Sequence, residues 1–232
     1  MTTRAANGAG KTTLLRLMSG KRLAPTSTIS IGGLDPFKDG LTGVTYLGME
    51  WVLNPIVRND ISVSELLASV GGPHYPERRD QLVAILDIDV DWHMHAVSDG
   101  ERRRVQLAMG LLRPWSILLL DEVTVDLDVL ARARFLDFLK EETETRGCTV
   151  VYATHILESA GAWATHVARV SLGEVMYYGK TNEILEKEGG KTLLETVLKW
   201  LEEDLVKRGP RGKKSEAVSY RDVTKVELDI QV

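Results

Sequence analysis

The sequence contains one cysteine, Cys148, so neither an internal disulfide nor a multi-cysteine metal site can form. It has no apolar run near the roughly 18 residues that a membrane-spanning helix needs, and residues 1–6 lack the apolar stretch of a secretion signal. An excess of charge of one sign is also absent, because 29 basic and 33 acidic residues leave a net charge of −4. This balance argues against direct nucleic-acid binding as the main activity. We therefore expect a soluble intracellular protein.

The 232 residues have ordinary globular composition, with 44% hydrophobic and 27% charged residues. In the first half of the chain, their patterning predicts a helix after Gly10, short strands at 28–31 and 44–48, and helices within 62–113. Further along, it predicts a hairpin across 168–179 and a helix across 193–205. A basic linker at 207–214 then precedes a possible strand at 226–232. We group these elements into an ATPase-like core (1–48 and 114–180), a helical subdomain (49–113), and a C-terminal helix with a basic tail (181–232).

Two apolar segments predict parallel strands of a buried sheet. Residues 117–120 run into Asp121 and Glu122, and residues 149–153 are followed closely by His155, with a helical pattern between the two segments. Such a strand–helix–strand unit binds ligands beyond the carboxyl ends of its strands. The acidic pair and the histidine are therefore expected at one functional edge.

A glycine-rich segment matches the end of the phosphate-binding pattern G-x-x-x-x-G-K-[ST], with Ala5 in place of the first glycine. Its residues are Asn7, Gly8, Ala9, Gly10, Lys11, Thr12 and Thr13. The backbone N–H groups would surround phosphate oxygens, Lys11 would neutralise their charge, and Thr12 would ligate Mg²⁺. Taken alone, the match leaves an ordinary glycine-rich turn equally open.

The acidic pair predicts a site for a cation. Two carboxylates at the end of a buried strand need a positive partner, and Mg²⁺ on Asp121 would supply it. Glu122 would then orient or deprotonate the attacking water. The alternative is an acidic turn that caps the next helix. A lone His155 is more often a packing residue, but its place after a strand near this pair favours a functional role.

Ser98 and Glu101 fit the capping box S-x-x-E, which predicts a helix that starts at this point. By itself the pattern indicates only a helix start. A helix N-terminus just before the acidic strand would also form a further anion site.

Taken in order, these segments resemble the nucleotide-binding domain of ABC-type ATPases over residues 5–179. By this likeness the successive motifs are the Walker A loop (7–13), the signature loop (97–101), Walker B (117–122), the D-loop (125–128) and the switch histidine (154–155). The resemblance implies an α/β P-loop NTPase fold with a mostly parallel sheet core and a helical subdomain, and ATP and Mg²⁺ as cofactors. It also implies a head-to-tail homodimer, in which Ser98, Gly100 and Asp128 contribute to the nucleotide sites and Glu122 and His155 are catalytic.

Residues 86–90, 98–114 and 121–134 look most like the soluble ABC ATPases that lack membrane domains. That group has fungal members associated with the carbon-catabolite-repression deadenylase complex and plant members of the ABC transporter I family. The likeness implies a cytoplasmic or nuclear ATPase that couples its nucleotide state to protein partners such as deadenylation or transcription regulators. Two alternatives stay open: an ATP-binding subunit of a membrane transporter, and a truncated non-catalytic interaction protein.

The sequence departs from the family pattern at three places. Asp99 adds a carboxylate to the signature loop, where it would repel a phosphate unless it points away. Glu50 stands where the family usually has a glutamine, and it could reach the metal through a water molecule. Only six residues precede Asn7, none a strong strand former, which predicts a shortened chain whose sheet lacks a central strand.

His93 and His95 raise the possibility of a second metal site. Their spacing offers no third ligand nearby in the sequence, so surface or core packing is the favoured interpretation.

Overall fold

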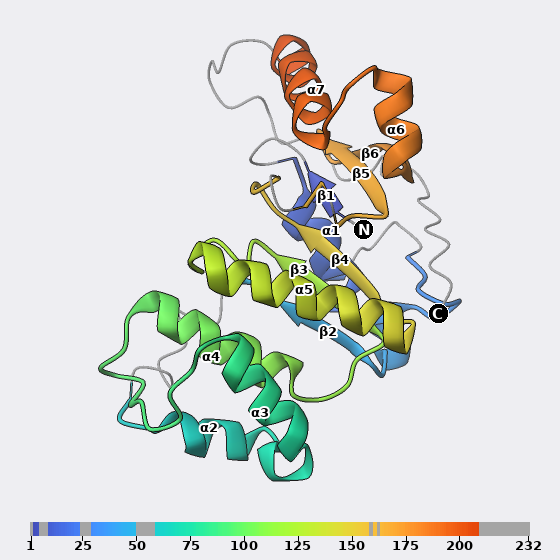
Figure 1. The fold of residues 1–232 in the computed structure, drawn as a ribbon. Coiled ribbons are helices and arrows are strands. Elements are labelled where there is room, and N and C mark those ends of the chain that lie inside the picture. Colours follow the sequence, from blue (N-terminus) through green and yellow to red (C-terminus); the bar gives the residue numbers. More distant parts are fainter. Residues whose placement is uncertain are drawn as a thin grey trace. The chain divides into compact units, whose positions relative to one another are not determined.

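The computed structural model describes residues 2–4, 9–23, 29–49, 59–157, 160–161 and 163–208. The chain forms two compact units (Figure 1). The first comprises Met1–Thr42 and Val151–Gln231, and the second comprises Gly43–Val150. Strand β4 (Thr149–Ala153) crosses this boundary, with its first two residues in the second unit.

Most of the sheet in the first unit is parallel. Its strands run in the order β4-β1-β5-β6, where β1 is Thr2–Arg4, β5 is His166–Ser171 and β6 is Glu174–Lys180. Strands β5 and β6 form the antiparallel hairpin that the sequence predicts, with the turn at Leu172 and Gly173. The helices of this unit are α1 (Lys11–Met18), the π-helix at Pro36–Gly40, α6 (Thr181–Glu188) and α7 (Leu193–Arg208).

The expectation that the sheet lacks a central strand is wrong. Strand β1 pairs in parallel with β4 on one side, where Thr2 faces Tyr152, and with β5 on the other, where Thr2 faces Val167. Strands β4 and β5 offer backbone donors and acceptors on both sides of these three residues. The hydrogen bonds formed with them outweigh the weak intrinsic preference of the three residues for a strand.

The second unit joins two sheet strands and the start of β4 to a group of helices. Strands β2 (Val44–Leu47) and β3 (Ile117–Asp121) are parallel, and the order continues to β4. The helices are α2 (Val63–Ser69), a short 3₁₀ helix (Gly72–His74), α3 (Pro76–Ile85), α4 (Asp99–Leu111) and α5 (Val129–Arg146). Figure 1 shows α2, α3 and α4 grouped together, and α4 also contacts β2.

Close packing of α4 on β2 depends on a glycine. A Cβ atom at Gly110 would lie 2.3 Å from Leu47 Cδ2, so only hydrogen lets the helix approach the strand this closely. Every residue of β3 is buried, as its unbroken apolar sequence predicts.

Two weaker strand predictions have different outcomes. Residues 29–31 form no strand, and only Ile31 makes an isolated bridge, to Leu34. The positive φ angles of Gly32 (57°) and Gly33 (83°) turn the chain back at once. The possible strand at 226–232 lies outside the described residues.

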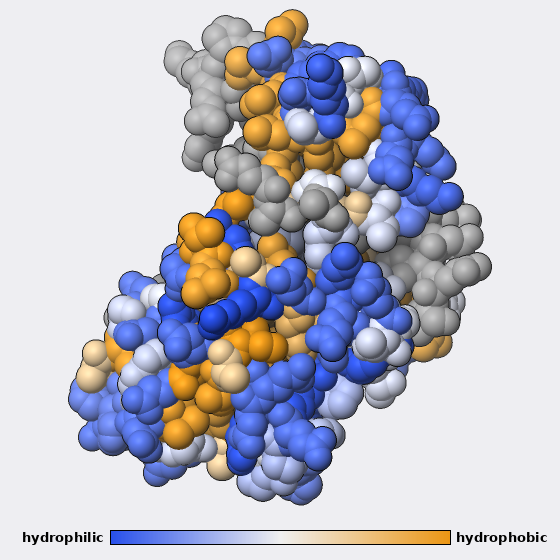
Figure 2. Space-filling model, in the orientation of Figure 1, coloured by the Kyte–Doolittle hydropathy of each residue, from blue (hydrophilic) through white to orange (hydrophobic). Residues whose placement is uncertain are grey.

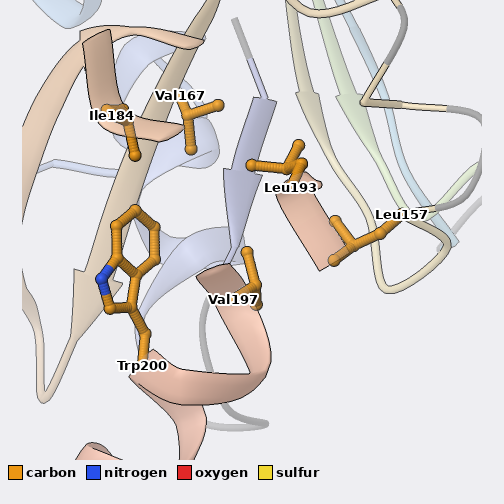
Figure 3. Packing of buried hydrophobic residues seen from close by; sticks show 6 residues of the cluster. All are labelled: Leu157, Val167, Ile184, Leu193, Val197 and Trp200. Atoms are coloured by element: carbon orange, nitrogen blue, oxygen red, sulfur yellow. The ribbon is translucent and has the colours of Figure 1, made fainter. Parts of the chain in front are cut away.

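Within the first unit, an apolar cluster packs the C-terminal helices α6 and α7 against the sheet. Figure 3 shows side chains of α6, α7, β5 and the segment after β4 gathered in one cluster. The buried members are Leu157, Val167, Ile184, Leu193, Val197 and Trp200. The predicted helix α7 therefore packs onto the sheet through its apolar face, while α6 has no counterpart in the sequence predictions.

Candidate functional site

The expected phosphate loop turns at Gly10, which lies in the first unit. Gly10 has a φ of 107°, a conformation that favours glycine, and it is the N-cap of α1. Just before it, the carbonyl of Ala9 accepts a 2.9 Å hydrogen bond from the N–H of Gly173 in the β5–β6 turn. Ala9 also packs with Val170. The hairpin thus fixes the described end of the loop, while Asn7 and Gly8 lie outside the described residues.

The first turn of α1 has the features of an anion site. No described side chain caps the helix, and its first turn holds no acidic residue. Lys11 is buried at the first helical position and Thr12 is half-buried beside it. Thr13 Oγ1 accepts a 3.4 Å hydrogen bond from Arg22 Nη1. Uncapped N–H groups, the helix dipole and a lysine charge all favour a phosphate here.

The acidic pair lies at the end of β3 in the second unit. Asp121 is 4% exposed, and its Oδ2 atom accepts a 3.3 Å hydrogen bond from Tyr46 Oη on β2. Its Oδ1 atom is buried and accepts no hydrogen bond from any residue that the structure describes. A buried carboxylate oxygen is costly without a partner. A divalent cation with oxygen ligands fits this atom, so Asp121 suits Mg²⁺.

Glu122 has a φ of 54°, in the left-handed region. For a residue with a Cβ atom this conformation costs roughly 1–2 kcal/mol. Such strain is typical of functional positions, where the surrounding structure holds a side chain in one direction. Glu122 therefore differs from an ordinary strand-end residue.

His155 lies two residues after the end of β4, in the first unit, and its side chain is exposed. The preceding Thr154 is buried, and its Oγ1 atom accepts a 3.0 Å hydrogen bond from the N–H of Ile156. This turn fixes the backbone on either side of His155. Because its side chain is exposed, His155 is not a packing residue of the core, and that interpretation is wrong.

The predicted capping box at the start of α4 is confirmed. Ser98 Oγ accepts from the N–H of Glu101, and Glu101 Oε2 accepts from both the N–H and the hydroxyl of Ser98, each at 2.7 Å. The hydrogen bond from the backbone N–H of Ser98 is the main cause that lowers the pKa of Glu101. Ser98 itself is exposed at the helix N-terminus.

The extra carboxylate of Asp99 is paired within its own helix. Arg102 Nη1 donates to Asp99 Oδ1 at 2.8 Å, so a positive charge lies beside the negative one. The next residue, Gly100, faces the D-loop, since a Cβ atom there would lie 3.0 Å from the carbonyl oxygen of Asp126. The signature loop and the D-loop are therefore in close contact.

Asp128 is the N-cap of α5. Its Oδ1 atom accepts a 2.9 Å hydrogen bond from the N–H of Ala131, which is the main cause that lowers the pKa of this carboxyl group. Its Oδ2 atom accepts from Arg104 Nη2 of α4 at 2.5 Å. The D-loop aspartate thus links the beginnings of α4 and α5.

The sequence predictions missed Arg103, which is fully buried. Its guanidinium donates to Gly48 O at 3.2 Å, to Gln106 Oε1, and from Nε to Asp126 Oδ2 at 3.3 Å. Gln106 Nε2 donates to the same Gly48 carbonyl at 3.0 Å. One side chain therefore joins the segment after β2, the signature helix and the D-loop. Arg103 and Gln106 are three residues apart, so they share a helix face, which is the only signal that the sequence offers.

Glu50 lies outside the described residues.

His93 and His95 are both exposed, and a third potential metal ligand lies close to them in space although not in sequence. Asp60, more than thirty positions earlier in the chain, brings a carboxylate oxygen to both rings.

No helix in the described part of the chain is long and apolar enough to cross a membrane.

Comparison with known proteins places these motifs in a family context. The family model described as ABC transporter matches residues 6–125. CCR4-associated factor 16 of Saccharomyces cerevisiae is 54% identical over 187 residues, which cover 74% of this chain and 65% of that protein. ABC transporter I family member 20 of Arabidopsis thaliana is 42% identical over 223 residues, covering 91% of this chain and 67% of that protein. The chain thus spans about two thirds of the length of these relatives.

The fold comparison agrees with the expected fold class. A solved dimeric ATP-binding cassette, in a post-hydrolysis state with bound ADP and Pi, superimposes with a TM-score of 0.62 at 19% identity. The match covers 78% of this chain and 84% of that structure. At this identity the likeness concerns the fold, and the α/β P-loop class predicted from the motifs is confirmed.

Proposed function

Because the chain belongs to the ABC transporter family of ATP-binding domains, we propose that it is an Mg²⁺-dependent ATPase and that it acts as a regulatory factor through nucleotide-dependent dimerisation. The observation that carries the proposal is the buried Oδ1 atom of Asp121, which accepts no hydrogen bond within the described residues. A bound Mg²⁺ ion would balance the negative charge of that oxygen and neutralise charge on the phosphates.

Phosphate binding is assigned to the loop before α1. Backbone N–H groups of Ala9, Gly10, Thr12 and Thr13 would bind phosphate oxygens, together with those of Asn7 and Gly8, and the Lys11 ammonium would neutralise them. Thr12 would add its hydroxyl to the metal ligands, and Glu50 would reach the metal through water. The uncapped N-terminus of α1 supports this assignment.

Catalysis is assigned to Glu122 and His155. The carboxylate of Glu122, held in a left-handed conformation, would orient or deprotonate the water that attacks the γ-phosphate. His155 would contact the γ-phosphate and report its presence. His155 is exposed and lies just after β4.

Dimerisation is assigned to the surface around the D-loop and the signature loop. Apolar side chains that break the hydrophilic surface lie where α5 begins (Figure 2), and they are Val125, Val129 and Leu130. Val129 is 80% exposed in the single chain. A second copy would bury these residues and present Ser98, Gly100 and Asp128 to its nucleotide. The solved ATP-binding cassette with bound ADP and Pi, which has a similar fold, is itself dimeric.

The catalytic assignment is tested with Glu122→Gln. Loss of a general base lowers turnover by roughly 10²–10⁴-fold, so we expect steady-state ATP hydrolysis to fall by at least 10² while Mg·ATP binding is retained. Glu141→Gln on the exposed face of α5 is the matched control and should keep full activity. Equal turnover of Glu122→Gln and the unsubstituted chain would remove Glu122 from its assigned role.

The dimer is tested with a second substitution in the Glu122→Gln background. Mg·ATP should convert that variant from monomer to dimer in sedimentation velocity, and Val129→Asp should prevent the conversion because a charge would be buried in the interface. Val206→Asp on α7, where the side chain is 82% exposed, is the control. A monomer at saturating Mg·ATP, or a dimer that Val129→Asp leaves intact, would contradict the assignment.

The regulatory role and its partners rest on the relatives. The name of the yeast protein associates it with CCR4, which supports a complex of deadenylation or transcription regulators as the partner and the cytoplasm or nucleus as the location. The alternative, a subunit of a membrane transporter, is supported by the plant relatives' name. Cell fractionation separates the two: co-sedimentation with an integral membrane protein would favour the transporter role.

A non-catalytic interaction protein is the remaining alternative. Mg·ATP at 100 times its dissociation constant should stabilise a competent site by about 2.7 kcal/mol. A thermal unfolding curve that Mg·ATP does not shift would favour this alternative over the ATPase.

A further inference from the structure

We propose that Asp60, His93 and His95 form a surface binding site for a divalent transition-metal ion such as Zn²⁺. These residues play no part in the proposed ATP site. All three are exposed, and one ligand atom from each lies within 4.8 Å of the others.

The ligand atoms already converge on one point. Asp60 Oδ1 lies 2.5 Å from His93 Nδ1 and 3.2 Å from His95 Nδ1. The two imidazole rings are 6.0 Å apart between centroids and cross at 74°, so both turn a nitrogen toward the carboxylate without stacking. Ligand atoms on one tetrahedral Zn²⁺ are about 3.3 Å apart when its bonds are about 2.0 Å long. The separation from His95 already matches this spacing, and the separation from His93 would have to lengthen by side-chain rotation.

The backbone that carries these side chains is well fixed. The segments before α2 and α4 lie side by side (Figure 1), with an antiparallel bridge between Ser62 and His93. The N–H of Met94 donates to Ile61 O at 2.9 Å, and the N–H of Val63 donates to Trp92 O at 2.9 Å. The positions of the ligands therefore depend on two hydrogen-bonded segments and not on a free loop.

A tight turn places both histidines on the surface. The N–H of Ala96 donates to His93 O at 2.9 Å, which closes a turn over residues 93–96. Met94 is fully buried within this turn, whereas His93 and His95 on either side of it are exposed. The N-cap Ser62 begins α2 two residues after Asp60 and holds the carboxylate's backbone beside them.

The chemistry of the three groups favours transition-metal ions over Mg²⁺. Imidazole nitrogens bind Zn²⁺, Ni²⁺ and Cu²⁺ well, whereas Mg²⁺ prefers oxygen ligands alone. Three protein ligands leave a fourth position of Zn²⁺ for water or for a side chain of a partner protein.

The test is calorimetric titration of the full chain, without nucleotide, with ZnCl₂ and separately with MgCl₂. We expect one Zn²⁺ per chain at micromolar affinity or tighter. His93→Gln, His95→Gln and Asp60→Asn should each weaken binding at least 10-fold, and the double histidine variant should abolish it. His74→Gln, another exposed histidine in the same unit, is the matched control and should bind as the unsubstituted chain does.

Circular dichroism melting without metal checks that the variants fold, which their exposed positions lead us to expect. Absence of micromolar Zn²⁺ binding by the folded, unsubstituted chain would overturn the proposal. Binding that survives in the double histidine variant would also overturn it, since the ion would then lie elsewhere. Neither result bears on ATP hydrolysis, so the two proposals fail independently.

Discussion

At the residue scale, two buried charged groups distinguish the second unit from an ordinary packed domain. The Asp121 carboxylate has one hydroxyl donor, from Tyr46, and one oxygen that suits a metal ion. Arg103 is instead satisfied by protein groups, and its one described carboxylate partner is Asp126. The first arrangement leaves an oxygen for the proposed metal ion, and the second is structural.

Replacing Arg103 tests its structural role. Arg103→Met should destabilise the chain by about 3 kcal/mol, because removal of one partner from a buried ion pair leaves the other uncompensated. The estimate is at the lower end of the usual range since Asp126 is partly exposed. Urea unfolding followed by circular dichroism measures the change. Arg134→Met, on the exposed surface of α5, should change stability by less than about 0.5 kcal/mol. Similar losses in the two variants would contradict the network.

At the element scale, the glycines that follow helices α1 and α6 differ in how much room they have for a side chain. Gly20 follows α1 with a φ of 69°, and Gly189 follows α6 with a φ of 68°. A Cβ atom at Gly20 would lie 2.3 Å from the carbonyl oxygen of Pro36, whereas one at Gly189 would contact nothing within 4 Å. The two glycines share their backbone conformation and differ in their surroundings.

This pair separates backbone strain from steric clash. Gly189→Ala should cost about 1 kcal/mol, the strain of a left-handed alanine. Gly20→Ala should cost at least about 1 kcal/mol more, because the π-helix at Pro36–Gly40 must move away from α1. Thermal unfolding of both variants measures the difference. Equal melting temperatures would show that the chain accommodates a methyl group at Gly20 freely.

At the scale of the whole molecule, each unit has its own stabilising cluster. In the second unit Glu142 of α5 accepts from Arg78 of α3 at 2.6 Å and from Arg146 at 2.5 Å. Burial alone would raise the pKa of Glu142, but its hydrogen bonds to the two arginines outweigh burial and the pKa lies below its ordinary value of 4.5. In the first unit Arg169 joins β5 to Asp204 and Glu203 of α7.

Acid should therefore weaken the second unit through Glu142. A carboxyl group whose pKa is lowered on folding stabilises the fold above its unfolded pKa, and this contribution disappears as the pH falls through the folded pKa. Unfolding free energy measured from pH 7 to pH 3 should fall below about pH 4.5, and less steeply in Glu142→Gln. Glu141→Gln is the adjacent exposed control and should keep the original slope. Identical slopes in all three proteins would exclude Glu142 as a cause.

Local patterns were sufficient for the elements whose signals lie within a few residues. The apolar run of β3, the capping box of Ser98 and Glu101, and the β5–β6 hairpin were all predictable. The order of motifs from the phosphate loop to His155 was sufficient for the family. In each case the physical cause, whether a cap, a turn or a buried run, is contained in the segment itself.

Contacts between distant segments had to come from the tertiary structure. The three residues of β1 form a strand only because β4 and β5 pair with both of their edges. Asp60 becomes a neighbour of His93 and His95 through hydrogen bonds between two segments some thirty residues apart. Arg103 is buried because Gly48 and Asp126 approach the same helix face. The sequence determined which residues can carry chemistry, and long-range pairing decided which of them meet, since backbone hydrogen bonds and burial depend on partners that no local pattern specifies.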